Sequence, residues 1–272
     1  MIFKRRTAKK NPGVTFDKYS LYRKAVQSPE GDVEFFAQVY RELRNKNAKV
    51  LREDFCGTFA LCKHWVKMNK TNHAIGVDWD PEPMEYGKAH YLKKLPAADQ
   101  KRVQLHERNV LEPGLPSADI AVALNFSYSC FKKRAELKKY FANVFASLNK
   151  NGIFILDRFG GSQCHDAIED RIVHKGFTYY WDQESFDPVT HEALFHIHFR
   201  VGKAKHERVF TYDWRLWTIP ELRELLEEVG FKKTHVYWEG TTSDGKGDGV
   251  FTRTEKGEAC LSWIAYVVGT KG

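Results

Sequence analysis

A glycine and an aspartate with the spacing of a nucleoside site lie in the first third of the chain. Gly57 follows a short apolar stretch, and Asp78 follows the next one, about 20 residues later. A small residue at a strand–helix turn lets a ligand approach the backbone, and the following helix offers free N–H groups and a partial positive charge. A carboxylate at the end of the second strand can accept both hydroxyls of a ribose. Each residue alone is typical of an ordinary turn or strand end, but together they predict a nucleoside-binding site.

The elements that would position these residues alternate between strands and helices. We expect strands at 49–52, 73–77, 102–107, 118–124 and 153–156. Helices are expected at 32–45, from the turn at Gly57 to 68, at 81–94 and at 133–148, the first capped by Asp32 and the third by Asp80. Such alternation predicts a parallel sheet with right-handed crossovers, and ligands of these sheets bind beyond the carboxyl ends of the central strands.

The pattern changes after about residue 170. From 171 to 217 strand patterns follow one another without helices, with a hairpin turn at 186–191 and apolar residues alternating with polar ones along 195–201. Thr218 then begins a helix that Gly230 ends. Two final strands are expected at 231–238 and 260–268, joined by a Gly-rich loop at 240–249.

Size and composition fit one cytoplasmic α/β protein. The 272 residues are 42% hydrophobic, and they include neither an apolar stretch long enough to span a membrane nor a signal-peptide core. The five cysteines are odd in number and form no Cys-x-x-Cys pair, which argues against a disulfide framework or a zinc site. The net charge of +8 would attract anions, but Lys and Arg are spread along the chain, so nucleic acid is only weakly indicated as a partner.

Residues 49–157 resemble the core of class I S-adenosylmethionine (SAM) dependent methyltransferases. The segments that carry the resemblance are 49–58, 76–80, 106–110, 124–126 and 148–156, the last reading LNKNGIFIL. The resemblance implies a Rossmann-like, seven-stranded, mostly parallel sheet with an antiparallel last strand, and SAM as the cofactor. The sequence EDFCGT at 53–58 and the phrase YDWRLWTIP at 212–220 resemble a subgroup of this family without a firmly known substrate.

The resemblance also implies cofactor-binding positions. They are Glu53, Cys56, Gly57 and Thr58 around the first turn, Asp78 and Trp79 after the second strand, Asn109 and Val110 after the third, Asn125 after the fourth, and Tyr19 and Tyr22 in the segment that folds over SAM. Glu53 would serve the amino end of the methionine moiety. The sequence departs from the family where Phe55 and Phe59 replace the first and third glycines of the motif. Asp54 either faces the other side of the strand or caps the following helix.

The antiparallel segment 171–217 resembles the insertion that roofs the active site in small-molecule methyltransferases. The chain thus divides into a tail and lid at 1–31, a core at 32–170, this insertion, and a helix with two strands at 218–272. Asn125 offers a donor and an acceptor near the methyl group, and no Pro-Pro-aromatic sequence follows it, which argues against methylation of DNA bases. His165, Glu184 and His198 are the candidate bases. His191, His196 and His198 more closely fit a solvated strand than a metal site, so no metal is predicted.

The sequence therefore predicts a SAM-dependent methyltransferase with a small-molecule acceptor. An RNA methyltransferase is an alternative that depends on the charge, and a non-catalytic SAM-binding module is one that depends on Phe55 and Phe59. A nicotinamide dehydrogenase is disfavoured, because no Gly-x-Gly-x-x-Gly follows the first strand. The acceptor and the oligomeric state are left open.

Overall fold

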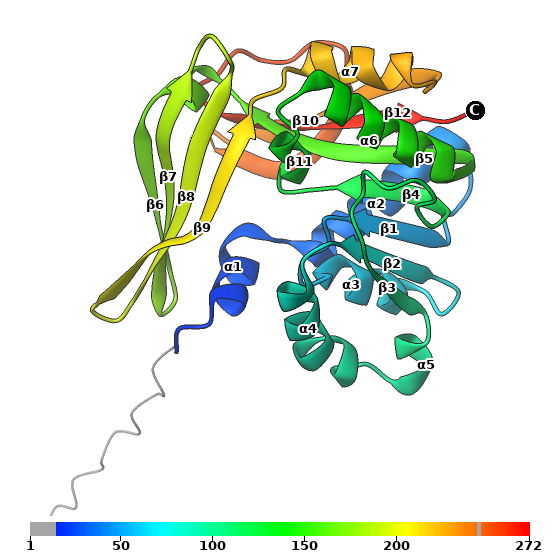
Figure 1. Cartoon of the computed structure of the whole chain (residues 1–272), viewed down its shortest axis with the longest axis horizontal. Helices are drawn as coiled ribbons and strands as arrows, with labels where there is room; N and C mark the ends of the chain where they lie inside the picture. The colour runs from blue at the N-terminus through cyan, green and yellow to red at the C-terminus, as the bar shows by residue number, and fades with distance from the viewer. Residues whose placement is uncertain (1–14, 244–245) are drawn as a thin grey trace, which may run out of the picture.

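Two β-sheets organise the computed structural model of the protein, which describes residues 15–243 and 246–272 (Figure 1). The strands of the larger sheet are β1 (Val50–Asp54), β2 (His73–Asp78), β3 (Val103–Glu107), β4 (Ala118–Ala123), β5 (Leu148–Gly160), β10 (Lys233–Thr241), β11 (Gly247–Thr254) and β12 (Trp263–Thr270). They lie in the order β11-β10-β12-β5-β4-β1-β2-β3. The smaller sheet has the order β6-β7-β8-β9.

Five neighbouring strands of this sheet, β5, β4, β1, β2 and β3, are parallel, as the alternation of elements predicted. β4 lies between β1 and β5, and five of its six residues are buried. A strand covered on both faces is expected to be apolar throughout, which explains the continuous apolar stretch at this place in the sequence. The carboxyl ends of β1, β2 and β4 therefore meet at one edge of the sheet.

The larger sheet has eight strands, so the predicted count of seven is wrong. β12 is antiparallel to both β5 and β10, in agreement with the predicted antiparallel last strand. The additional strand is β11, which pairs with β10 at the sheet edge and includes part of the segment expected to be a loop. Most residues of β11 are exposed, and a strand without a buried face lacks the alternating pattern by which a sequence reveals strands.

Helices cover both faces of the larger sheet. α2 (Pro29–Arg44) and α3 (Ala60–Met68) pack on one face, whereas α6 (Arg134–Ser147) and α7 (Ile219–Glu228) pack on the other. The remaining helices are α1 (Lys18–Val26), α4 (Pro81–His90), α5 (Ala97–Gln100), η1 (Leu92–Lys94), η2 (Ser127–Cys130) and η3 (Ser162–His165). None of the helices among the described residues combines the length and apolarity needed to cross a membrane.

The helix starts agree with the predictions at two places and differ at a third. Asp80 accepts a hydrogen bond from the N–H of Glu82, and Thr218 forms a capping box, so both cap helices as expected. Asp32, however, does not cap a helix. α2 begins at Pro29 with Ser28 at the N-cap, because the fixed φ of proline suits the first helical position. Asp32 consequently lies inside the first turn of α2.

The smaller sheet consists of β6 (Ile168–His174), β7 (Phe177–Asp187), β8 (Glu192–Val201) and β9 (Ala204–Arg215). It is antiparallel throughout, as predicted, but it begins before residue 171 and has four strands. Leu21 of α1 packs against its apolar face, so the helix lies between the smaller sheet and the rest of the molecule (Figure 1).

Candidate functional site

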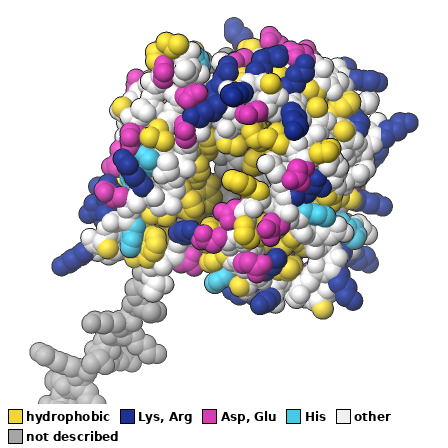
Figure 2. Space-filling view, viewed as in Figure 1, with side chains coloured by type: hydrophobic (Ala, Val, Ile, Leu, Met, Phe, Trp, Pro, Cys, Tyr) yellow, Lys and Arg dark blue, Asp and Glu magenta, His cyan; other side chains and the backbone are white. Residues whose placement is uncertain are grey.

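Connected cavities lie beyond the carboxyl ends of the central strands. Figure 2 shows the hollow between the two sheets, with hydrophobic side chains along its walls. Three of the cavities, of about 200, 460 and 270 Å³, share Asn125 in their walls. A fourth cavity, of about 520 Å³, extends along the ends of β2 and β3 and shares Phe55 with the cavity of about 270 Å³. Open α/β sheets bind ligands at this edge.

The turn after β1 has left-handed backbone at three positions. Gly57 has φ 50°, and Phe55 and Phe59, which replace the motif glycines, have φ 58° and 47°. Such angles are costly for a bulky residue and persist only where packing holds them. Phe55 packs against Phe131 and Tyr140, and Phe59 is buried in the core. Packing of these two aromatic rings therefore maintains a left-handed backbone at positions where the family motif has glycine.

Asp78 is held against this turn. Its Oδ2 accepts a hydrogen bond of 2.7 Å from the N–H of Gly57, and its Oδ1 accepts one of 3.0 Å from the N–H of Asp80. Burial raises the pKa of the Asp78 carboxyl, while these backbone donors oppose the shift. Since each carboxylate oxygen has a second acceptor site, both can still receive ribose hydroxyls from the cavity that Asp78 lines.

The same cavity brings together the predicted cofactor-binding residues that follow β2 and β3. Trp79, Asn109 and Val110 line it beside Asp78. Trp79 is 74% exposed, so its ring is available to cover a ligand, and Val110 is buried. The side-chain oxygen of Asn109 accepts the N–H of Leu111, which fixes the turn after β3. These residues offer a flat apolar wall and a polar rim, a lining that suits a nucleoside base.

Glu53 and Asp54 point to opposite faces of β1. Glu53 is 5% exposed, its Oε2 lies 3.7 Å from the Cys62 thiol, and it lines two of the cavities. Burial raises its pKa well above the usual range. Asp54 forms a bidentate pair with Arg52, at 2.8 and 3.1 Å, and accepts the Tyr140 hydroxyl at 2.9 Å. Asp54 therefore faces the opposite side of the strand and does not cap α3.

A second strained turn carries Asn125. Asn125 and Phe126 have φ 52° and 58°, and the Asp157 carboxylate accepts both of their N–H groups, at 2.7 and 2.9 Å. Burial raises the pKa of Asp157 to about 7, against the effect of these two donors. Sequence reasoning missed Asp157, although a carboxylate directly after the apolar stretch 153–156 was a visible signal.

Tyr22 and Tyr19 of α1 both reach the cavity of about 270 Å³ that Cys56, Gly57 and Thr58 also line. Tyr22 packs against Phe210 of β9, whereas the Tyr19 hydroxyl donates to Glu82 of α4 at 3.0 Å. α1 therefore closes this cavity from the side opposite the turn after β1.

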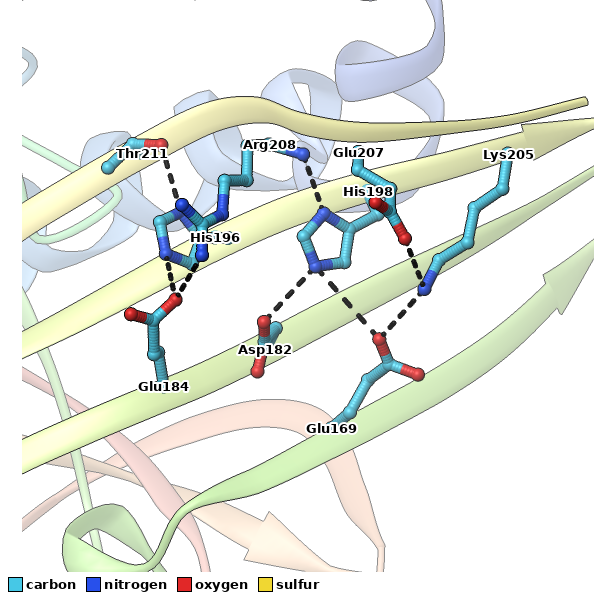
Figure 3. Close-up of polar contacts among 9 residues, drawn as sticks. All are labelled: Glu169, Asp182, Glu184, His196, His198, Lys205, Glu207, Arg208 and Thr211. Carbon is cyan, nitrogen blue, oxygen red and sulfur yellow. Dashed lines mark hydrogen bonds and ion pairs between the residues drawn. The ribbon is translucent and has the colours of Figure 1, made fainter.

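The three candidate bases lie outside these cavities. His165 is exposed and stacks on Phe186 at 4.3 Å. His198 and Glu184 lie on the face of the smaller sheet that carries the polar network of Figure 3. That face is opposite to the one on which Ile197 lines a cavity, because neighbouring residues of a strand point to opposite sides.

The polar face of Figure 3 is also less solvated than expected. His196 and His198 are 2% and 5% exposed. The Nε2 atom of His198 lies 3.1 Å from Asp182, and its Nδ1 accepts the N–H of Arg208 at 2.7 Å. Charged side chains thus cover the two rings. Within residues 15–243 and 246–272, no group of three or more His, Cys, Asp or Glu side chains is placed to hold a metal ion.

Comparison with known proteins is informative only at the level of structure. No protein-family model matches the chain, and no curated protein matches its sequence. A SAM-dependent methyltransferase from Clostridium acetobutylicum has a TM-score of 0.69 at 17% identity, over 93% of this chain and 98% of that one.

Two further matches are methyltransferases of amino sugars and sugars. CalS10, an amino pentose methyltransferase from Micromonospora echinaspora, has a TM-score of 0.66 at 17% identity, over 96% of this chain and 100% of that one. The sugar N-methyltransferase KedS8 from Streptoalloteichus has a TM-score of 0.61 at 18% identity, over 100% and 98%. The chain therefore has the Rossmann-like fold of SAM-dependent methyltransferases.

Proposed function

We propose that the protein is a SAM-dependent methyltransferase that acts on a small molecule. The observation that carries the proposal is the convergence on Asn125 of cavities that also reach Gly57, Glu53 and the smaller sheet. In a methyltransferase fold, this arrangement joins the donor turn at Gly57 to a second, separate site. Two ligands, one in each site, would meet beside the turn at Asn125.

The residues present fit SAM. Asp78 would accept the ribose hydroxyls, Val110 and Trp79 would contact the adenine, and Glu53 would accept the methionine ammonium group. When bound, SAM supplies an electrophilic methyl group on a sulfonium sulfur. The chain would contribute by positioning the two ligands and by excluding water, since an in-line displacement needs little more.

A small acceptor is favoured by the cavity between the sheets. Its walls carry the aromatic rings of Phe126, Phe159, Trp181, Tyr212 and Trp214. Among the described residues that line it there is no Lys or Arg, whereas a phosphate backbone requires cations. The similar structures named above include methyltransferases of amino pentoses and sugars, which also supports a small acceptor. We propose that residues 168–215 roof this site, that residues 15–28, the described part of the segment before α2, cover the donor side, and that the chain belongs to the EDFCGT subgroup.

Calorimetric titration tests the proposal. We expect SAM and S-adenosylhomocysteine to bind with one site per chain and NAD not to bind. Binding of NAD without binding of SAM would refute the assignment of the nucleoside site.

A further inference from the structure

The cavity of about 460 Å³ is lined by carboxylates from four separate elements. They are Asp32 of α2, Glu53 of β1, Asp157 of β5 and Glu239 of β10. No Lys, Arg or His is found among the described residues of its wall, although the chain carries a net charge of +8. Carboxylates gathered in one desolvated space repel one another, and a cation placed among them relieves the repulsion.

Two of these carboxylates are already engaged. Both oxygens of Asp157 accept the N–H groups of the Asn125 turn, and Glu239 accepts the N–H of Gly249 at 3.1 Å. The hydroxyl of Tyr266, which lines the same cavity, favours the ionised form of Asp32. Burial, the largest effect, raises the pKa of Asp32 to about 6, while Tyr266, Arg23 and the Ser28 backbone oppose the shift and Glu30 adds to it.

One buried acceptor in the wall lacks a hydrogen-bond donor. The Oε1 atom of Gln27 is buried without a partner among the described residues. Buried acceptors are rarely left unpaired, so this atom independently indicates a ligand that donates hydrogen bonds. An ammonium group has three donors and a positive charge, which matches this wall.

We propose that this cavity binds the methyl acceptor as a protonated amine and that Asp32 accepts the proton of the amine. The inference rests on the proposed methyltransferase function. Asn125 lines this cavity and the donor-side cavity at Gly57, so an amine nitrogen near Asn125 lies between the two. The apolar body of the acceptor would occupy the aromatic cavity between the sheets, which shares Asn125, Phe126 and Ile264 with the acidic one.

The proton must leave before methyl transfer, because an ammonium nitrogen has no lone pair. One N–H bond of the ammonium breaks, and its proton moves to a carboxylate oxygen of Asp32. The freed lone pair forms the new N–C bond to the methyl carbon, and the electron pair of the broken C–S bond stays on sulfur. Asp32 then passes the proton to water, so that one proton is released for each methyl group transferred.

Binding of three matched probes tests the acceptor class. 2-Phenylethylamine, 2-phenylethanol and 3-phenylpropionate share an apolar ring and differ in the terminal group. We expect the amine to bind the protein saturated with S-adenosylhomocysteine at least tenfold more tightly than either other probe, in a calorimetric titration at pH 7.5. Equal or tighter binding of the alcohol or the acid, or no binding of the amine, would overturn the inference.

Asp32→Asn tests the role of the carboxylate, with Glu34→Gln as the control on the same helix. Glu34 is exposed and lines none of these cavities. We expect Asp32→Asn to weaken amine binding at least tenfold and to slow methylation of the amine by roughly 10²–10⁴-fold. Its affinity for SAM should stay within twofold of the wild type, which also shows that the variant is folded. Unchanged amine binding and methylation in Asp32→Asn would overturn the role of Asp32.

The two proposals fail in different ways. A wild-type protein that does not bind SAM would overturn the methyltransferase function and the amine inference with it. A protein that binds SAM and prefers the alcohol or the acid would overturn only the amine inference.

Discussion

The proposed donor side and the proposed acceptor side of the cleft are built in different ways. On the donor side, Gly57, Asp78 and Val110 lie at or just beyond strand ends, and backbone hydrogen bonds hold the Asp78 carboxylate. On the acceptor side, aromatic rings from the second sheet face carboxylates from α2, β5 and β10. Only on the donor side do the residues lie in short segments that follow one another in a fixed order along the sequence. The chemistry of the donor side is therefore local in sequence, whereas that of the acceptor side is assembled from distant segments.

The largest expected effect comes from the buried ion pair of β1, next to the turn at Gly57. Arg52 and Asp54 are paired with both side chains 0% exposed. Arg52→Met leaves the Asp54 charge buried without its partner, and we expect the free energy of unfolding to fall by about 3–5 kcal/mol. Urea unfolding followed by circular dichroism measures the change.

Lys88→Met is the control for this variant, since it breaks an ion pair with Glu85 in which both side chains are exposed. It should cost less than about 1 kcal/mol. Equal losses in the two variants would show that the buried pair does not support the donor side.

A second variant separates the two sides directly. Asp78→Ala removes charge-assisted hydrogen bonds to the ribose, so we expect SAM to bind about ten- to a thousandfold more weakly. Binding of 2-phenylethylamine to this variant without the nucleoside should change by less than twofold, because Asp78 does not line the acidic or the aromatic cavity. Calorimetry measures both constants. A SAM affinity equal to that of the wild type would remove Asp78 from the donor site.

The acceptor side should make stability depend on pH. The folded-state pKa values of Asp157 and Asp32 are raised to about 7 and about 6, above the values of unfolded aspartate. The folded state therefore binds more protons than the unfolded state between about pH 4 and 7, and its stability decreases as the pH rises through this window.

We expect the free energy of unfolding to fall by up to about 5 kcal/mol from pH 4.5 to pH 7.5 through these two groups. Urea unfolding at several pH values measures it. The double variant Asp32→Asn/Asp157→Asn should lose most of this dependence. A wild-type slope of the opposite sign would contradict the burial of these carboxyls as the dominant effect.

Asp80 gives a smaller effect and a control for Asp78. Its side chain accepts the N–H of Glu82 at 2.9 Å and caps α4. Asp80→Ala should therefore reduce stability by about 1 kcal/mol and leave SAM affinity within a few-fold of the wild type. Thermal unfolding and calorimetry measure the two quantities. Loss of SAM binding in this variant, with Asp78→Ala unaffected, would reassign the end of the second strand.

The smallest effect is expected on the far face of the second sheet. Glu184 interacts there with His196 and Arg208, at 2.9 and 2.8 Å, on the side away from the cavities. Glu184→Gln should leave the affinities for SAM and for the amine, and the rate of methylation, within about twofold of the wild type. A rate loss of a hundredfold or more would return Glu184 to the list of candidate bases.

The sequence alone determined where Gly57 and Asp78 of the proposed donor side lie, because the signals for these positions are local. A glycine turn, a strand-end aspartate and a regular alternation of strands and helices place Gly57 and Asp78 at one sheet edge in any parallel sheet of this kind. The strained Phe55 turn and the pairing of Asp54 with Arg52 were less visible. Phe55 packs against Phe131 and Tyr140, and Tyr140 also donates a hydrogen bond to Asp54, although both aromatic residues lie far along the chain.

Only the tertiary structure decided which residues line the proposed acceptor side. Whether His198 faces the cleft or the outside depends on which side of the second sheet packs inward, and the alternation along β8 is the same in both cases. β11 was hidden because an exposed edge strand has no buried face. Asp32, Asp157, Glu239 and Tyr266 share a cavity because alternate residues of three strands point to one face of the sheet and the first turn of α2 covers that face. Their proximity follows from strand order, which no local pattern of residues encodes.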